Sequence, residues 1–433
     1  MKRQLASRSG RHSDIEFRES YMWLNLRRFV GFLGLLALAA SAQAADYETP
    51  RDRSAKEILG PGGLKGQHYR IRDVVVVDGY MERWSVDSDF GAFEVQGNGA
   101  LRKLLKEIRA IGELQKVRKS EAFTKGLAGA AKAPVSLAKS FITHPVDTIS
   151  GVPSGAYQLL ENVATSATTT KDPSEDSRIA QALKMSAFKR KYAAQLDVDP
   201  YSSNKVLQKQ LNSVAWAASV GDWAFSVAML PAGAAGSVVS NVRLANSVKN
   251  ALKDEPPARL RIINDDKLAK MGIAEDLRKR FLDHPAFTPT HDTIIAANLE
   301  RLGGVAGRDA WLTVALTAQD ETEANLYAAM VQILRGYHET VAPLTEISTT
   351  GRLAVAQTKA GQAMIPLPVD RLVWTPRVDQ VSGQLKTTYQ GAGFNGKFEV
   401  WATGTLSARA RQELIQRGYA VTERVETRVE ILD

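Results

Sequence analysis

The chain contains no cysteine in its 433 residues. This absence constrains the fold most, because it excludes disulfides, thiol catalysis, iron–sulfur clusters and cysteine-ligated zinc. Packing alone must therefore hold the structure together, which is feasible because the chain is long enough for two or three domains, each with its own core. Apolar residues make up 44% of the chain and charged residues 24%, which is typical of globular proteins and not of disordered chains or many-span membrane proteins.

The N-terminal region has the pattern of a secretory signal. Arg27 and Arg28 precede the apolar run Phe29–Ala40, and small residues follow up to Ala44. The run is too short to span a bilayer as a helix. The pattern predicts a signal peptide cleaved after Ala44 and a mature protein in the periplasm or cell envelope. Because the polar residues before Met22 do not belong to such a signal, we expect translation to begin at Met22.

Shifts in composition predict an α+β fold with several parts. A β-rich stretch with a turn at Asp78-Gly79 predicts a small β-meander, and leucines and isoleucines at helical spacing over residues 101–114 predict the helix that covers it. Residues 397–425 predict a strand–helix–strand unit near the C-terminus. The expected parts are a signal peptide (1–44), a polar leader (45–66), the meander with a basic helical region (67–166), a linker (167–176), a helical domain (177–342) and a strand-rich C-terminal module (343–433).

Positive charge is concentrated in one segment. Residues 97–140 hold ten Lys or Arg and three Glu, whereas the net charge of the whole chain is +9. Lys125, Lys132 and Lys139 recur every seven residues, which places them along one helical face. We expect this face to contact an anionic membrane surface or an anionic envelope protein, and we do not expect nucleic acid as a partner. The alternative is the solvated face of an ordinary packed helix, and Pro134 interrupts the helix.

A serine hydrolase is one enzymatic alternative. Ser136 and Lys139 match S-x-x-K, Ser202-Ser203-Asn204 matches S-x-N, and Lys359-Ala360-Gly361 approaches K-T-G, in the order found in penicillin-interacting enzymes. Ser136 would be the nucleophile and Lys139 its base. The third motif has Ala in place of Ser or Thr, and S-x-x-K occurs twice more in the chain, so the pattern has little specificity.

A metal site would have to use histidines and carboxylates. His284, His291, Asp292 and His338 are the candidates, although the chain has no H-E-x-x-H motif and prolines separate the first two histidines. No phosphate-binding glycine loop is present, and we expect no small-molecule cofactor.

One long segment is almost uncharged. Ser213–Ser240 contains Asp222 as its single charge and is rich in Ala, Gly, Ser and Val. It predicts a buried helical hairpin, with membrane insertion as the alternative. The leading functional hypothesis is an exported, non-enzymatic binding or structural protein. An extracytoplasmic hydrolase and a membrane-inserting effector are the alternatives.

Overall fold

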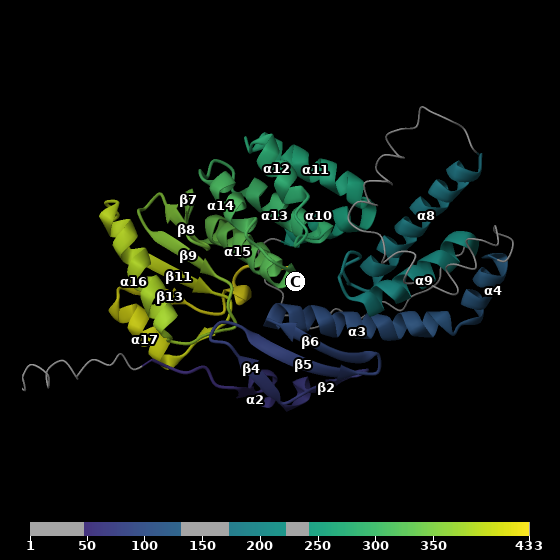
Figure 1. Ribbon diagram of the computed structural model, residues 1–433, viewed down its shortest axis with the longest axis horizontal. Helices are drawn as coiled ribbons and strands as arrows, with labels where there is room; N and C mark the ends of the chain where they lie inside the picture. The colour runs from purple at the N-terminus through teal and green to yellow at the C-terminus, as the bar shows by residue number, and fades with distance from the viewer. Residues whose placement is uncertain (1–46, 131–172, 222–241, 433) are drawn as a thin grey trace, which may run out of the picture. The chain divides into compact units, whose positions relative to one another are not determined.

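The computed structural model of the protein describes residues 47–130, 173–221 and 242–432 (Figure 1). The chain divides into two compact units, Met1–Glu48 and Thr49–Asp433, and the fold described below is that of the second. It combines an N-terminal antiparallel sheet, a helical middle and a C-terminal sheet with helices, which confirms the predicted α+β class. The expected signal peptide and its cleavage site lie outside the described residues.

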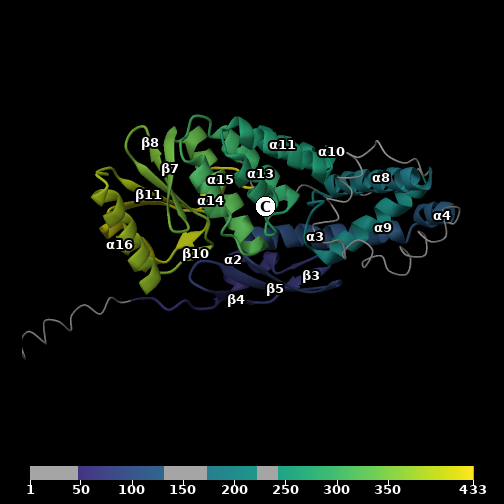
Figure 2. The same cartoon turned by 45° about the horizontal axis from the view of Figure 1, so that its top comes forward.

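The first sheet is antiparallel, and the long helix α3 (Asn98–Arg118) covers one of its faces (Figure 2). Strand β5 is central: β6 pairs with one edge, while β4 and β3 share the other. Because side chains alternate along a strand, Trp84 and Val86 point to the same face, where they pack against Leu104 and Ile108 of α3. The strands are β1 (Arg53–Ser54), β2 (Lys65–Gly66), β3 (Tyr69–Ile71), β4 (Val74–Val77), β5 (Glu82–Ser88) and β6 (Gly91–Gln96).

The segment expected to be a polar leader is part of this sheet. Strand β1 pairs with β4, and the short helix α2 (Ala55–Leu59) follows it. Ala55 is fully buried, and its backbone N–H donates to the Asp73 carbonyl (2.6 Å). The Ser54 hydroxyl donates to the Asp73 carboxylate (2.7 Å). A few apolar side chains and these hydrogen bonds are enough to place a mainly polar segment within the fold.

The middle of the second unit is helical and has two cores. One core joins α3 to α4, α8 and α9 through Leu114, Leu207 and Leu211. The other is centred on α13 and α15, with Ile295 and Leu334 fully buried. The expected linker ends inside a helix, because α8 begins at Pro173. The helices are α4 (Glu121–Ala130), α8 (Pro173–Gln195), α9 (Lys205–Gly221), α10 (Val242–Asp254), α11 (Pro257–Lys270), α12 (Glu275–Leu282), α13 (Pro289–Arg301), α14 (Arg308–Ala315) and α15 (Glu321–Thr340).

The C-terminal sheet has helices on both faces (Figure 1). Its strand order is β13-β11-β9-β8-β7, and β11 runs parallel to β9 and β13. Val355 and Val400 point toward α16 and α17, whereas Met364 and Trp401 belong to the core around α15. The expected strand–helix–strand unit is present as β11, α17 and β13. The elements are β7 (Leu344–Thr350), β8 (Leu353–Thr358), β9 (Ala363–Leu367), β10 (Arg371–Leu372), α16 (Pro376–Gly391), β11 (Phe398–Ala402), β12 (Thr405–Leu406), α17 (Ala408–Gln416) and β13 (Tyr419–Thr422).

The long uncharged segment is described only in its first part. Residues 213–221 belong to α9, where Ala215, Ala217 and Ala218 are buried, and residues 222–240 lie outside the described residues. Among the helices that the structure describes, none combines the length and apolar character needed to cross a membrane.

Candidate functional site

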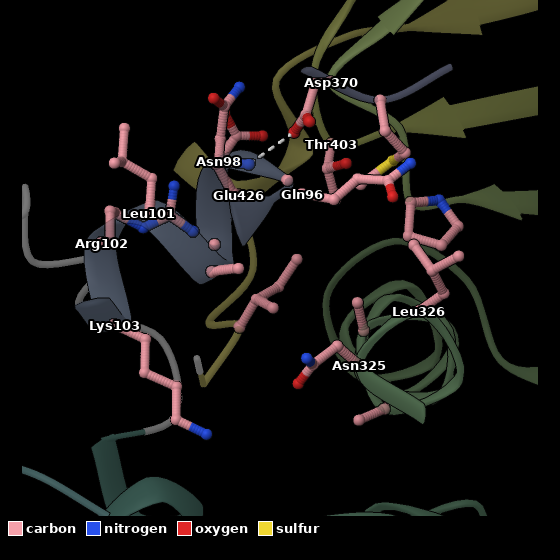
Figure 3. Close-up of a pocket in the computed structure, with 18 of the residues that line it drawn as sticks. Gln96, Asn98, Leu101, Arg102, Lys103, Asn325, Leu326, Asp370, Thr403 and Glu426 are labelled. Carbon is pink, nitrogen blue, oxygen red and sulfur yellow. Dashed lines mark hydrogen bonds between the residues drawn. The ribbon is translucent and has the colours of Figure 1, made fainter. Parts of the chain in front are cut away.

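A cavity of about 350 Å³ lies where three distant parts of the chain meet (Figure 3). The start of α3 forms one wall, α13 and α15 form another, and loops of the C-terminal module close it. Apolar side chains such as Leu101, Ile294 and Leu326 line much of the cavity, and a small number of polar and charged groups interrupt them. This combination of size, composition and position between structural regions is typical of ligand sites. We call this space the central cavity.

Asp370 connects the C-terminal module to the start of α3. Its carboxylate accepts the backbone N–H of Asn98 (3.0 Å), at the first turn of α3, and the backbone N–H of Glu82 (2.9 Å). Helix N-termini leave such N–H groups without partners, so Asp370 acts as a cap supplied from 272 residues away. Gly404 permits this approach, because a Cβ there would lie 2.0 Å from the Asp370 carbonyl oxygen.

Burial affects the protonation of Asp370. It raises the pKa of Asp370 to about 6, although the two N–H groups that it accepts act in the opposite direction. The neighbouring Glu82 is also buried, but it is paired with Arg53 (2.6 Å) and accepts the side-chain amide of Asn98 (3.1 Å). Two buried carboxylates therefore hold the start of α3 in place, and Asp370 also lines the central cavity.

Glu426 supplies a second carboxylate to the cavity wall. It lies in a short 3₁₀ helix (Val425–Thr427), and its Oε2 atom is buried without a hydrogen-bond partner among the described residues. Burial raises the pKa of Glu426, against a hydrogen bond from its own backbone N–H and the attraction of Arg102 and Arg424. A buried acceptor that lacks a donor is unfavourable in the ligand-free protein, by about 1–3 kcal/mol. Glu426 is thus the cavity group with the clearest unmet requirement for a hydrogen-bond donor.

His291 and Asn325 form a neutral hydrogen-bonding pair on the opposite wall. The Thr288 backbone N–H donates to His291 Nδ1 (3.2 Å), so Nε2 carries the proton and donates to Asn325 Oδ1 (2.9 Å). Burial lowers the pKa of His291, which keeps the ring uncharged at neutral pH. Because the Asn325 oxygen is engaged in this way, its amide NH₂ is the group that it offers to the cavity (Figure 3).

Lys103 lies beside the cavity in an ion-pair network. Its ammonium is near the carboxylates of Asp199 (3.4 Å) and Glu321 (3.5 Å), and only 16% of the side chain is exposed. Burial alone would lower the pKa of Lys103, but Asp199, Glu321 and Glu107 outweigh it, so the pKa is raised and the residue stays charged. Lys103 belongs to the segment that was predicted to contact an external anion, but its charge is paired with Asp199 and Glu321 of the same chain.

Other cations of the predicted basic surface are also paired. Lys125 is the one predicted contact lysine within the described residues, and it pairs with Glu121 (2.8 Å) on the exposed side of α4. Lys106 pairs with Asp197 (3.3 Å). Lys132 and Lys139 lie outside the described residues. The described part of the basic segment therefore neutralises much of its charge locally.

The candidate metal ligands do not converge. His291 faces Asn325 of α15, whereas Asp292 lies near Arg261 and Asp283 on the other side of α13. His338 lies thirteen residues along α15 from Asn325, which corresponds to about 20 Å. Its Nδ1 atom accepts the Leu344 backbone N–H (3.0 Å). His284 Nδ1 accepts the Ala286 backbone N–H (3.3 Å). Within the described ranges, no three His, Asp or Glu side chains group as metal ligands.

The residues of the proposed serine-hydrolase motifs have structural roles where they are described. Ser202 Oγ (2.5 Å) and Asn204 Nδ2 (2.8 Å) donate to the buried Glu107 carboxylate, and Asn204 Oδ1 accepts N–H groups at the start of α9. Lys359-Ala360-Gly361 forms the turn between β8 and β9. Ser136 lies outside the described residues together with Lys139.

Comparison with protein families, curated proteins and solved structures finds no match to this chain. The interpretation of the central cavity therefore depends on its own residues and their chemistry.

Proposed function

We propose that the protein binds a small ligand in the central cavity and that this ligand carries an ammonium or another cationic group. Glu426 lines the central cavity, and its Oε2 atom is buried without a partner among the described residues. This observation carries the proposal, because a small rotation of the side chain would bring Oε2 to a ligand N–H donor. An ion pair formed there would also be shielded from water.

The charge balance of the surrounding groups supports a cationic ligand. Asp370 and Glu426 both line the cavity, and burial raises both pKa values, so a positive charge placed beside them would stabilise their ionised forms. Arg102 attracts both carboxyl groups but does not offset their burial. The charge of Lys103 is already matched by Asp199 and Glu321, so it does not favour an anion.

The apolar part of the cavity indicates the rest of the ligand. Leu101, Ile294 and Leu326 suit a hydrocarbon portion, and the Asn325 amide suits a hydrogen-bond acceptor. A small organic amine with an apolar body and one acceptor fits all of these groups. We also propose, from the export signal, that binding takes place outside the cytoplasm.

Isothermal titration of the full chain with butylamine, putrescine and the uncharged analogue butanol tests this function. We expect the amines to bind and butanol not to bind. Glu426→Gln keeps the side-chain size and removes the charge, and it should weaken amine binding by about tenfold or more, equivalent to about 1.4 kcal/mol. Glu94→Gln, at an exposed position of β6, is the matched control and should bind like the wild type. Failure of both amines to bind, or equal binding of butanol, would overturn the proposal.

A further inference from the structure

A second hollow lies in the C-terminal module, away from the residues of the central cavity. It is an open groove of about 550 Å³ between β7, β8 and the loop that follows α16. Residues 348–350 and Gln357 line it from the sheet, Thr388 and Tyr389 from the last turns of α16, and residues 392–396 from the loop. All of these lining residues are uncharged at neutral pH. We call this hollow the C-terminal groove.

The groove contains several neutral hydrogen-bonding side chains. Thr350, Gln357, Thr388 and Asn395 contribute hydroxyl and amide groups, each of which can donate and accept. These four side chains make no hydrogen bond to any other residue that the structure describes. They are therefore available to a ligand that offers many donors and acceptors at short intervals.

Two aromatic residues, Tyr389 and Phe394, line the groove beside these polar groups. The half-buried Phe394 ring packs edge-on against Phe398, with 5.0 Å between ring centroids. The Tyr389 hydroxyl is hydrogen-bonded to Ser348, so that its ring is held in place. An aromatic wall next to hydroxyl and amide groups suits a ligand with alternating C–H and O–H surfaces.

The backbone packs closely on one side of the groove. A Cβ at Gly396 would lie 1.7 Å from the Gly361 carbonyl oxygen, so the loop and the β8–β9 turn approach as closely as glycine permits. The Phe394 backbone N–H donates to the Tyr389 carbonyl (2.9 Å), which continues the end of α16 into the loop. A preformed groove loses little conformational freedom when it binds a ligand.

We infer that the C-terminal groove binds a neutral saccharide. An ionic ligand would find no opposite charge among the lining residues. An apolar ligand would bury the hydroxyl and amide groups without replacing the hydrogen bonds that they make to water. A sugar ring satisfies both requirements, because its hydroxyl groups can reach Gln357 and Thr388 while its C–H face lies on Phe394. This inference is independent of the central cavity and of the amine proposed for it.

Saturation-transfer NMR and titration of the full chain with maltotriose, cellotriose and chitotriose test the inference. We expect at least one of them to bind with a Kd of about 1 mM or tighter. The double variant Gln357→Leu with Thr388→Val removes polar groups at nearly constant volume, and it should weaken binding at least tenfold. Thr387→Val is the matched control, because Thr387 is exposed but its hydroxyl donates to the Gly383 carbonyl (3.0 Å) outside the groove.

Three results would overturn the inference. The first is that none of the trisaccharides binds. The second is that binding is unchanged in a folded Gln357→Leu/Thr388→Val variant, which would place the sugar elsewhere. The third is that trigalacturonate, which carries carboxylates, binds as tightly as the neutral sugars. Glu426→Gln should leave saccharide binding unchanged, which separates this test from that of the central cavity.

Discussion

The central cavity and the C-terminal groove differ in the charge and the burial of the polar groups that line them. The cavity buries the carboxylates of Asp370 and Glu426, and the hydrogen-bond partners of Asp370 come from segments far apart from it in the chain. The groove places neutral side chains such as Gln357 and Thr388 at the surface, and its lining comes from residues 348–396 alone. A charged group that is buried away from water needs hydrogen-bond or ion-pair partners within the protein. A neutral polar group at the surface can instead make hydrogen bonds to water until a ligand binds.

This difference has a structural consequence. The central cavity exists only when the first sheet, the middle helices and the C-terminal module are all in place. The groove requires only the C-terminal sheet and α16. Changes that loosen contacts between the regions should therefore damage the cavity before the groove.

Asp370→Ala should have the largest effect. It leaves the backbone N–H groups of Glu82 and Asn98 without an acceptor in a buried site, and we expect the free energy of unfolding to fall by about 3 kcal/mol. Urea denaturation measures this loss. Asp309→Ala, at an exposed position in the first turn of α14, is the control and should change stability little. A loss no greater than that of the control would mean that the long-range cap is unimportant.

The same residue should make stability depend on pH. The folded-state pKa of Asp370 is raised to about 6 from 3.8, so its contribution is fully present below about pH 4 and declines as the pH rises through 6. The stability advantage of the wild type over Asp370→Asn should therefore shrink by about 2 kcal/mol between about pH 4 and pH 7.5. Thr388→Val in the uncharged groove should show a pH-independent difference. An advantage that grows with pH would contradict the assigned cause.

Gly396→Ala should affect the groove and leave the cavity intact. The added Cβ cannot fit beside the Gly361 carbonyl oxygen, so the loop must move, with an expected loss of about 1–2 kcal/mol in the free energy of unfolding. Saccharide binding should be lost while amine binding persists. Gly391→Ala is the control, because a Cβ there meets nothing within 4 Å. Equal behaviour of the two variants would argue against the tight loop approach.

Lys125→Glu should have the smallest effect on stability. Its ion pair with Glu121 is exposed, so the expected loss in the free energy of unfolding is under about 0.5 kcal/mol, as measured by thermal unfolding.

The predicted contact between the lysine face and an anionic membrane can be tested by a flotation assay with anionic liposomes, using a variant in which Lys125, Lys132 and Lys139 are all changed to Glu. Salt-sensitive flotation that this variant abolishes would support the surface contact. Absence of flotation by the wild type would remove that proposal.

Two of the buried carboxylates could have been anticipated from local sequence. Glu107 lies on the apolar face of the helix predicted over residues 101–114, between Leu104 and Ile111, and Asp370 interrupts the apolar run that ends at Trp374. An acidic residue among apolar ones indicates a buried carboxylate. Glu426 has no such signal, because neighbouring residues in the sequence do not show that its side chain is buried.

The amino-acid sequence was sufficient to predict the α+β class and the absence of disulfides. The acidic first turn and the apolar periodicity of α15 (Glu321–Thr340) are local properties that can be seen in the sequence. The capping of α3 by Asp370, the buried ion pairs of Lys103 and the separation of His291 from His338 became evident only from the three-dimensional structure. These outcomes depend on which distant segments meet, and charge, spacing and periodicity within one segment carry no information about those meetings.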